Sequence, residues 1–261
     1  MGVDVIKIAA TGGVTDARSL GEAGRAQLTT EEMSAICEEA HNADKVVAAH
    51  VQGEVGLIAA LRAGVDTIEH GCQLSPEAIE LFHDNPKALR GRSFLVPTLC
   101  AALPFAELDQ SQTGVSDVVK ANGEKIFQGM VDGLSCAIEH DVPLGIGNDS
   151  SMTYVTHYDF WRELEAWTLY SGLSRADVLN VATQGNADML GLTLKGRLEP
   201  GKDADLVVVK KSPLEGFDTL ASPRMVVARG EIINHPQVER FAEVDTDLDA
   251  IFDNLRKNRA A

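Results

Sequence analysis

Residues 46–70 read VVAAHVQGEVGLIAALRAGVDTIEH, and this stretch decides the fold. Its first five residues form a short apolar run, which is typical of a buried strand, and residues 53–63 follow with a helical pattern. A second apolar run at residues 65–69 completes the unit. A strand, a helix and another strand in succession predict two parallel strands joined by a helix that covers the sheet.

The same alternation continues on both sides of this unit. Upstream, Gly12 and Gly13 break a β-branched run, and residues 29–32 form a capping box that begins an amphipathic helix. Downstream, Ser75 and Pro76 are placed to begin another helix. Parallel strands are predicted at residues 3–10, 45–50, 65–69, 93–99 and 142–147, and later helices at 115–139, 158–171 and 174–190.

The character of the chain changes after residue 194. A turn-rich segment leads to an apolar strand near 206–209 and to two short strands around a tight turn at Arg229–Gly230. This pattern predicts a small β element that is separate from the parallel sheet. From Gln237 onward, apolar residues at helical spacing predict a docking helix. We therefore expect three segments, with boundaries 1–194, 195–236 and 237–261.

The acidic composition argues against several classes of partner. The 261 residues include 23 Lys and Arg and 39 Asp and Glu, for a net charge of −16. Because nucleic acids and anionic membranes attract basic surfaces, we expect no nucleic-acid partner and no membrane partner. No apolar run reaches the roughly 18 residues of a membrane span, and the start carries no export signal, so we expect a cytoplasmic protein. The four cysteines contain no Cys-x-x-Cys pair, which argues against a zinc knuckle.

Ionisable residues lie at or near the ends of four predicted strands. They are Lys7, His50, His70 and Asp149. Because parallel barrels place reactive side chains at the carboxyl ends of their strands, these residues are expected to converge on one pocket mouth. Two imidazoles and a carboxylate suit a divalent metal such as zinc. A single histidine at a strand end is more often structural, whereas a lysine within an apolar strand is costly to bury unless it is paired or modified.

Several motifs resemble those of the amidohydrolase superfamily. They are VDVIKI with GGV at residues 3–14, AAH at 48–50, AGVDTIEHG at 63–71, GND at 147–149, and the junction NADMLG at 186–191 followed by GRLEPGKDADLVV at 196–208. Within that superfamily the chain is most similar to the imidazolonepropionase-like branch, which includes Xaa-Pro dipeptidases. The resemblance implies strands four to eight of a (β/α)8 barrel, followed by the C-terminal part of a small β-sandwich.

The resemblance also implies a role for each candidate residue. Lys7 would be an N-carboxylated lysine that bridges two metals, and His50 and His70 would hold the second metal. Asp149 would bind the first metal, accept a proton from the attacking water and return it to the leaving amine. Gln52, Tyr154 and His157 would contact the substrate. Gln52 is a departure, because related peptidases carry a histidine there.

A larger departure concerns the family's first strand, which carries a His-x-His pair. No such pair occurs among the seven histidines, and a complete barrel alone takes about 250 residues. We therefore expect strands one to three to be missing. The complete family site holds two metals, so this chain would hold one or none, and it would associate into homo-oligomers or through its exposed barrel edges.

Three functions remain open at this point. The first is a metal-dependent hydrolase that cleaves an amide bond in a small-molecule substrate, a dipeptide such as Xaa-Pro or an N-acyl amino acid. The second is an inactive truncated fragment or pseudoenzyme. The third is a mononuclear cyclic-amide hydrolase, similar to imidazolonepropionase, or a deaminase, in which Lys7 would carry no carboxyl group.

Overall fold

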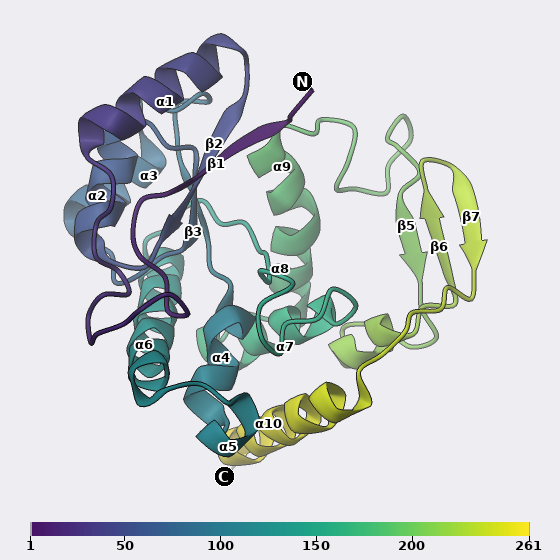
Figure 1. Ribbon diagram of the computed structural model, residues 1–261. Coiled ribbons are helices and arrows are strands. Elements are labelled where there is room, and N and C mark those ends of the chain that lie inside the picture. Colours follow the sequence, from purple (N-terminus) through teal and green to yellow (C-terminus); the bar gives the residue numbers. More distant parts are fainter. Residues whose placement is uncertain (1, 261) are drawn as a thin grey trace. The chain divides into compact units, whose positions relative to one another are not determined.

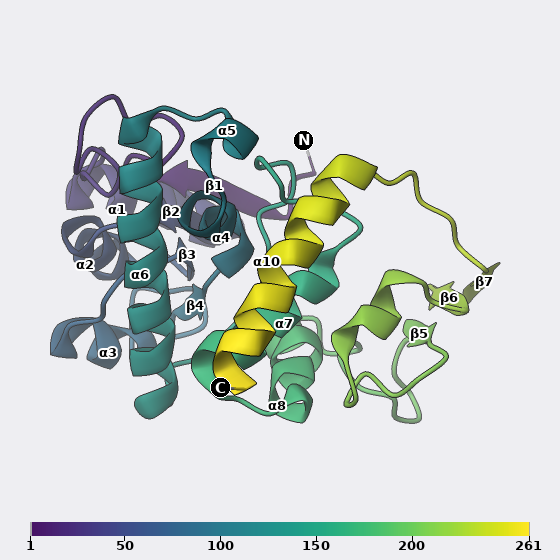
Figure 2. The same cartoon turned by 90° about the horizontal axis from the view of Figure 1, so that it is seen from below.

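The computed structural model describes residues 2–260, and the chain divides into two compact units, residues 1–145 and 146–261. Figures 1 and 2 label most elements of both units, with β4 labelled in Figure 2. The first unit contains β1 (Val5–Ala9), α1 (Thr30–Asn42), β2 (Val46–Val51), α2 (Glu54–Ala63), β3 (Thr67–His70), α3 (Pro76–His83), β4 (Phe94–Val96), α4 (Leu99–Glu107), α5 (Gln110–Thr113) and α6 (Asp117–Glu139).

The first four strands form a parallel sheet in the order β1-β2-β3-β4. Helices α1, α2 and α3 lie along one face of this sheet (Figure 1). The core between them contains Met33 of α1, Leu57 of α2 and Phe82 of α3, all fully buried against Val47 and Ile68. This arrangement confirms the βα alternation and the α/β fold class that the sequence predicts.

Local signals in the sequence fix the helix starts. Thr29 accepts a hydrogen bond from the backbone of Glu32, whose side chain accepts one from Thr29 in return, so the predicted capping box begins α1. Ser75 caps α3, with Pro76 as the first helical residue. Helix α2 ends at Gly64, where φ is 99° and a Cβ would lie 2.6 Å from the Lys87 carbonyl oxygen. Only glycine, which has no Cβ, both adopts this positive φ without strain and fits this close to the carbonyl oxygen.

Two strands differ from the expectation. Strand β1 was expected to be buried, but Val5 and Lys7 are exposed, since β1 hydrogen-bonds only to β2 among the described residues. The expected strand 142–147 forms only a single parallel bridge, Leu144 to Leu95. Pro143 has no N–H group to extend that pairing. The sequence also gave no sign of α4, which contains Pro104 in its interior.

The second unit contains α7 (Phe160–Ser171), α8 (Arg175–Asn180), a π-helical turn (Val181–Gly185), α9 (Asn186–Leu190), β5 (Leu206–Val208), the 3₁₀ turn η2 (Phe217–Ala221), β6 (Met225–Ala228), β7 (Glu231–Asn234) and α10 (Ala242–Ala260). Strands β5, β6 and β7 form a small antiparallel sheet, as predicted. Arg229 and Gly230 connect β6 and β7 with φ values of 53° and 81°, the signature of a tight hairpin turn.

Helix α10 crosses α7 within the second unit (Figure 2). The predicted boundaries at residues 194 and 236 stay predictions. No helix among residues 2–260 is long and apolar enough to span a membrane.

Candidate functional site

Two histidines meet at the carboxyl ends of neighbouring strands. His50 lies on β2 and His70 is the last residue of β3. Their ring centroids are 4.5 Å apart, and the rings meet edge to face at 69°. The sequence therefore predicts correctly that these two imidazoles come together.

The sheet register alone would not bring the two rings together. His50 is opposite Glu69, whereas His70 is opposite Val51, so strict alternation places the two histidines on opposite faces. His70 has a φ of 68°, which ends the extended backbone at this residue. A left-handed conformation is uncommon for residues other than glycine, although histidine adopts it more often than most, and it costs about 1–3 kcal/mol. The backbone therefore leaves the extended strand conformation at His70, the residue whose ring contacts that of His50.

The surroundings keep His70 neutral and hold its ring. The residue is only 4% exposed, and its Nδ1 atom shares a hydrogen bond with the Thr98 hydroxyl at 2.6 Å. Burial, with smaller contributions from the charges of His50 and Lys7, holds the pKa of His70 well below its ordinary value. A neutral imidazole oriented through one nitrogen is the form in which histidine binds metals. Thr98 was not predicted, although its position just after β4 is itself a strand-end signal.

The loop after β1 and the end of β2 frame His50. Its Nε2 atom lies 3.3 Å from the carbonyl oxygen of Gly12, in the predicted Gly-Gly loop. Two residues on, the backbone N–H of Gln52 donates to the Thr11 hydroxyl at 2.9 Å. Gln52 is 8% exposed, and its Oε1 atom is buried without a hydrogen-bond partner among the described residues. A buried amide oxygen in this state favours a bound group or water nearby.

Lys7 shares a sheet face with His50, because its register partner is Ala48, two residues before that histidine. The side chain is exposed, so the prediction that its ammonium group is buried at a cost in free energy is wrong for this structure. The reason is that β1 is an edge strand. The role of Lys7 as a metal ligand stays a prediction.

The remaining predicted residues lie in the second unit. Asp149 has a φ of 56°, and Ser151 and Tyr154 in the same loop also have left-handed φ values of 84° and 66°. The Tyr154 hydroxyl donates to Asp247 at 2.9 Å, and burial and this carboxylate raise its pKa. His157 is exposed and its ring contacts Tyr158. The roles of these residues in substrate binding and catalysis stay predictions.

The chemistry of the histidine pair fits a divalent metal, although the described residues do not assemble the full ligand set. Within residues 2–260, no three or more His, Cys, Asp or Glu side chains are grouped so that they could hold an ion. His50 and His70 form a two-imidazole cradle beside Lys7, while Asp149 belongs to the other unit. The structure thus brings two of the four predicted ligands together, and the metal site itself stays a prediction.

The sequence model of the amidohydrolase family matches residues 2–233. The chain belongs to this family. Among curated proteins, the ochratoxinase of Aspergillus niger is 26% identical over 247 residues, which cover 93% of this chain and 48% of that protein. An uncharacterized protein of Mycobacterium tuberculosis is 27% identical over 198 residues, covering 76% of this chain and 50% of that protein.

Two solved structures are also similar to this chain. A candidate prolidase from Bifidobacterium longum is 45% identical with a TM-score of 0.91, covering 96% of this chain and 60% of that one. A Xaa-Pro dipeptidase with methionine bound in its active site is 29% identical with a TM-score of 0.76, covering 89% of this chain and 55% of that one. This amidohydrolase chain therefore spans about half the length of its curated relatives and at most 60% of these two structures.

Proposed function

We propose that this protein is a metal-dependent amidohydrolase that cleaves an amide bond in a small substrate, a dipeptide such as Xaa-Pro or an N-acyl amino acid. The observation that carries the proposal is the pair of imidazoles at neighbouring strand ends, one of them buried and held neutral. Its support comes from family membership and from the similarity to a candidate prolidase and a Xaa-Pro dipeptidase.

His50 and His70 would hold the metal, for which zinc is the expected identity because imidazole nitrogen is a preferred zinc ligand. When bound, the ion would supply a Lewis acid that polarises the scissile carbonyl and lowers the pKa of water. Thr98 would keep the His70 ring in its ligating orientation through Nδ1. Lys7, in carboxylated form, is the proposed further ligand.

Asp149 would be the proton carrier of this reaction. Its carboxylate would accept a proton from the attacking water and then return it to the nitrogen of the leaving amine. Gln52, Tyr154 and His157 would orient the substrate, with the unpaired Oε1 of Gln52 available to accept a substrate N–H. The acidic composition supports a soluble cytoplasmic enzyme, and association through the exposed β1 edge is part of the same proposal.

The test combines metal analysis with turnover. The protein, purified with zinc present, is assayed for bound metal and for hydrolysis of Leu-Pro and N-acetyl-leucine. We expect bound metal that is lost in His50→Asn and His70→Asn, with turnover reduced at least 100-fold. His83→Asn is the matched control, because His83 is an exposed histidine of the same unit.

Two outcomes would contradict the proposal. Metal retained at the same stoichiometry in both variants would show that these histidines are not ligands. A wild-type protein with neither metal nor turnover would favour the inactive fragment. Asp149→Asn separates the roles further, because we expect it to abolish turnover while leaving metal on the histidine pair.

A further inference from the structure

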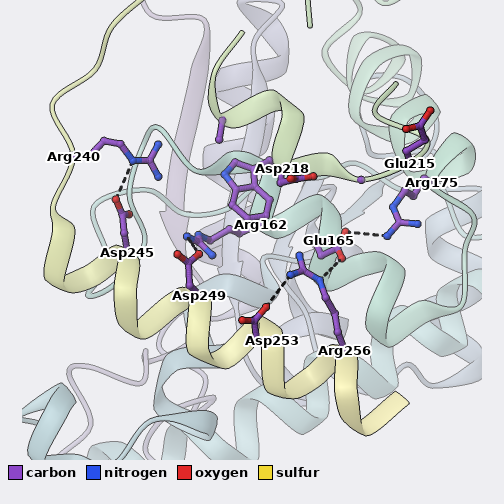
Figure 3. A pocket seen from close by; sticks show the side chains of 13 residues that line it. Arg162, Glu165, Arg175, Glu215, Asp218, Arg240, Asp245, Asp249, Asp253 and Arg256 are labelled. Atoms are coloured by element: carbon purple, nitrogen blue, oxygen red, sulfur yellow. Dashed lines mark hydrogen bonds and ion pairs between the residues drawn. The ribbon is translucent and has the colours of Figure 1, made fainter. Parts of the chain in front are cut away.

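A polar pocket of about 750 Å³ lies within the second unit, with walls that come mainly from α7, α10 and the η2 turn (Figure 3). All of its lining residues fall within residues 146–261, and Asp149, Tyr154 and His157 do not line it. Pockets for small organic ligands measure about 300–1,000 Å³, so this one is large enough for such a molecule. It is therefore a candidate binding site that the proposed hydrolase reaction does not use.

The wall of this pocket carries more negative than positive charge. Six carboxylates and four guanidinium groups line it, an excess of two negative charges. Each guanidinium group forms at least one ion pair with a carboxylate. Glu215 and Asp218, three residues apart, are exposed and form no ion pair within residues 2–260. A hollow surface with uncompensated carboxylates attracts ligands that carry ammonium or guanidinium groups.

The same pocket also contains buried polar atoms that lack a hydrogen bond. Among the described residues, Arg162 Nη1 and Arg175 Nε have no acceptor, and Glu165 Oε2 has no donor. Arg162 is 3% exposed and Glu165 is 2% exposed, so both side chains are almost fully enclosed. Buried polar groups are nearly always hydrogen-bonded, and guanidinium donors pair best with a carboxylate. These atoms therefore point to a bound group that supplies both an acceptor and a donor.

Neighbouring contacts fix the two enclosed side chains before any ligand binds. Arg162 donates from Nε to Asp159 at 3.1 Å and from Nη2 to Asp249 at 2.8 Å, and its guanidinium lies 4.5 Å from the centroid of the Trp161 ring. Glu165 accepts a hydrogen bond from Arg256 Nε at 3.0 Å (Figure 3). Because these groups are already ordered, a ligand would lose little additional side-chain freedom on binding.

We propose that this pocket binds a free basic amino acid, such as lysine or arginine. The carboxylate of the ligand would accept hydrogen bonds from Arg162 and Arg175, and its α-ammonium would donate to Glu165. The basic end of its side chain would pair with Glu215 and Asp218. A simple anion would be repelled by the excess of carboxylates, and a simple diamine would leave the arginine donors without an acceptor. A basic amino acid carries both kinds of group.

The test measures binding by calorimetry and needs neither metal nor turnover, so it does not depend on the proposed hydrolase function. Lysine, norleucine and cadaverine are each titrated into the full-length protein. Norleucine lacks the side-chain ammonium of lysine, and cadaverine lacks its carboxylate. We expect lysine to bind at least about tenfold more tightly than either compound. No binding of lysine, or an affinity equal to that of norleucine or cadaverine, would overturn the proposal.

A pair of matched double variants tests the location of the site. Glu215→Gln combined with Asp218→Asn should weaken lysine binding at least about tenfold. Glu231→Gln combined with Glu239→Gln is the control, because it removes the same charge from exposed residues of the same unit that do not line the pocket. An equal loss in both would indicate general electrostatic attraction and refute the site, as would an unchanged affinity in the first. If thermal unfolding shows that the first double variant does not fold, its two single variants are titrated, and each should weaken binding at least about threefold.

Discussion

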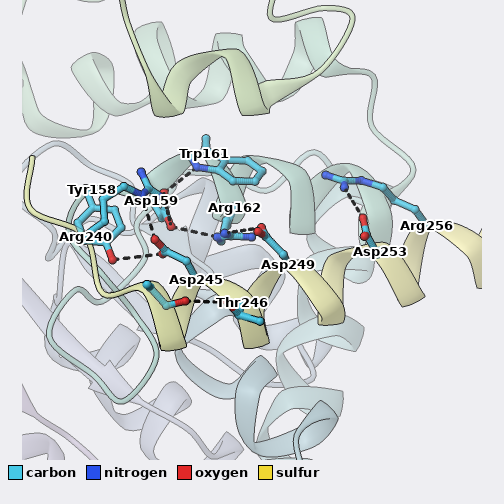
Figure 4. Close-up of polar contacts among 11 residues, drawn as sticks. Tyr158, Asp159, Trp161, Arg162, Arg240, Asp245, Thr246, Asp249, Asp253 and Arg256 are labelled. Carbon is cyan, nitrogen blue, oxygen red and sulfur yellow. Dashed lines mark hydrogen bonds and ion pairs between the residues drawn. The ribbon is translucent and has the colours of Figure 1, made fainter. Parts of the chain in front are cut away.

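Asp159 offers a sharp test of how the second unit is held together. Its carboxylate is 2% exposed and accepts hydrogen bonds from Trp161 Nε1 at 2.8 Å, from Arg162 Nε at 3.1 Å and from Arg240 Nη2 at 2.9 Å (Figure 4). The Arg162 side chain is itself only 4% exposed. Asp159→Asn keeps the shape of the side chain but removes the charge that compensates the Arg162 guanidinium.

The expected loss of unfolding free energy follows from the contacts that the two arginines keep after the substitution. Removing one partner of a buried pair costs about 3–5 kcal/mol, because the other charge stays buried without compensation. Arg162 keeps a second partner, Asp249, and Arg240 is 34% exposed and can turn to water. The expected loss is therefore near the lower limit, about 3 kcal/mol of unfolding free energy. With a urea slope of about 1–3 kcal/mol/M, the unfolding midpoint should fall by at least about 1 M.

The chain supplies both the reporter and the control. Its two tryptophans, Trp161 and Trp167, both lie on α7, so tryptophan fluorescence reports unfolding of the second unit. Asp249→Asn removes the same charge from the other partner of Arg162, but Asp249 is 66% exposed, so it should cost less than about 1 kcal/mol. If the two variants shift the midpoint equally, the burial of Asp159 does not determine its contribution and the reasoning is refuted.

Four further predictions concern the pH dependence of stability, core packing, a buried thiol and metal affinity. Burial raises the pKa of Asp159, but its hydrogen bonds and the charge of Arg162 lower it by more, so the net shift is downward. The stability that Asp159 provides should therefore be complete above pH ~3.9 and disappear as the pH falls through its folded-state pKa. Asp159→Asn should flatten this loss of stability with acid in fluorescence titrations. Leu57→Ala in the core should cost about 3–5 kcal/mol by urea unfolding, whereas Val55→Ala, 73% exposed on the same helix, should cost under ~0.5. Burial, with the Asp66 charge, raises the pKa of Cys37 to about 12, so native protein at pH 8 should label at this thiol about a thousandfold more slowly than unfolded protein by mass spectrometry. Thr98→Val should weaken zinc binding about 10–100-fold in chelator competition, and unchanged affinity would contradict its orienting role.

Local chemistry made much of this fold predictable. The capping box at Thr29 and the Pro76 helix start depend on residues within one turn, and each occurs where the sequence predicts it. The two histidines at the strand ends could be picked out in the same way, since a strand end is visible as the last residue of an apolar run. Strand pairing brings the neighbouring strand ends together, but the two rings meet only because the backbone departs from the extended conformation at His70.

Long-range contacts set the features that the sequence did not show. His41 lies in the last turn of α1, and its Nε2 lies 2.8 Å from Asp66, which also accepts hydrogen bonds from the backbone of Val47 and Leu89. The exposure of Lys7 depends on which strands flank β1, and no pattern within residues 3–10 carries that information. Both features need the positions of residues that are distant in the chain.

The left-handed residues show where a structural outlier carries functional information. Asp44 and Asp141 have φ values of 55° and 54° and each lies one residue beyond the C-cap of α1 or α6, where aspartate tolerates the left-handed conformation. His70 has a similar φ but lies at the end of a strand and not after a helix. Its cost must be offset by the surroundings, here burial, the Thr98 hydrogen bond and the contact with His50. That combination separates His70 from the other left-handed residues and makes it the strongest structural argument for a metal site.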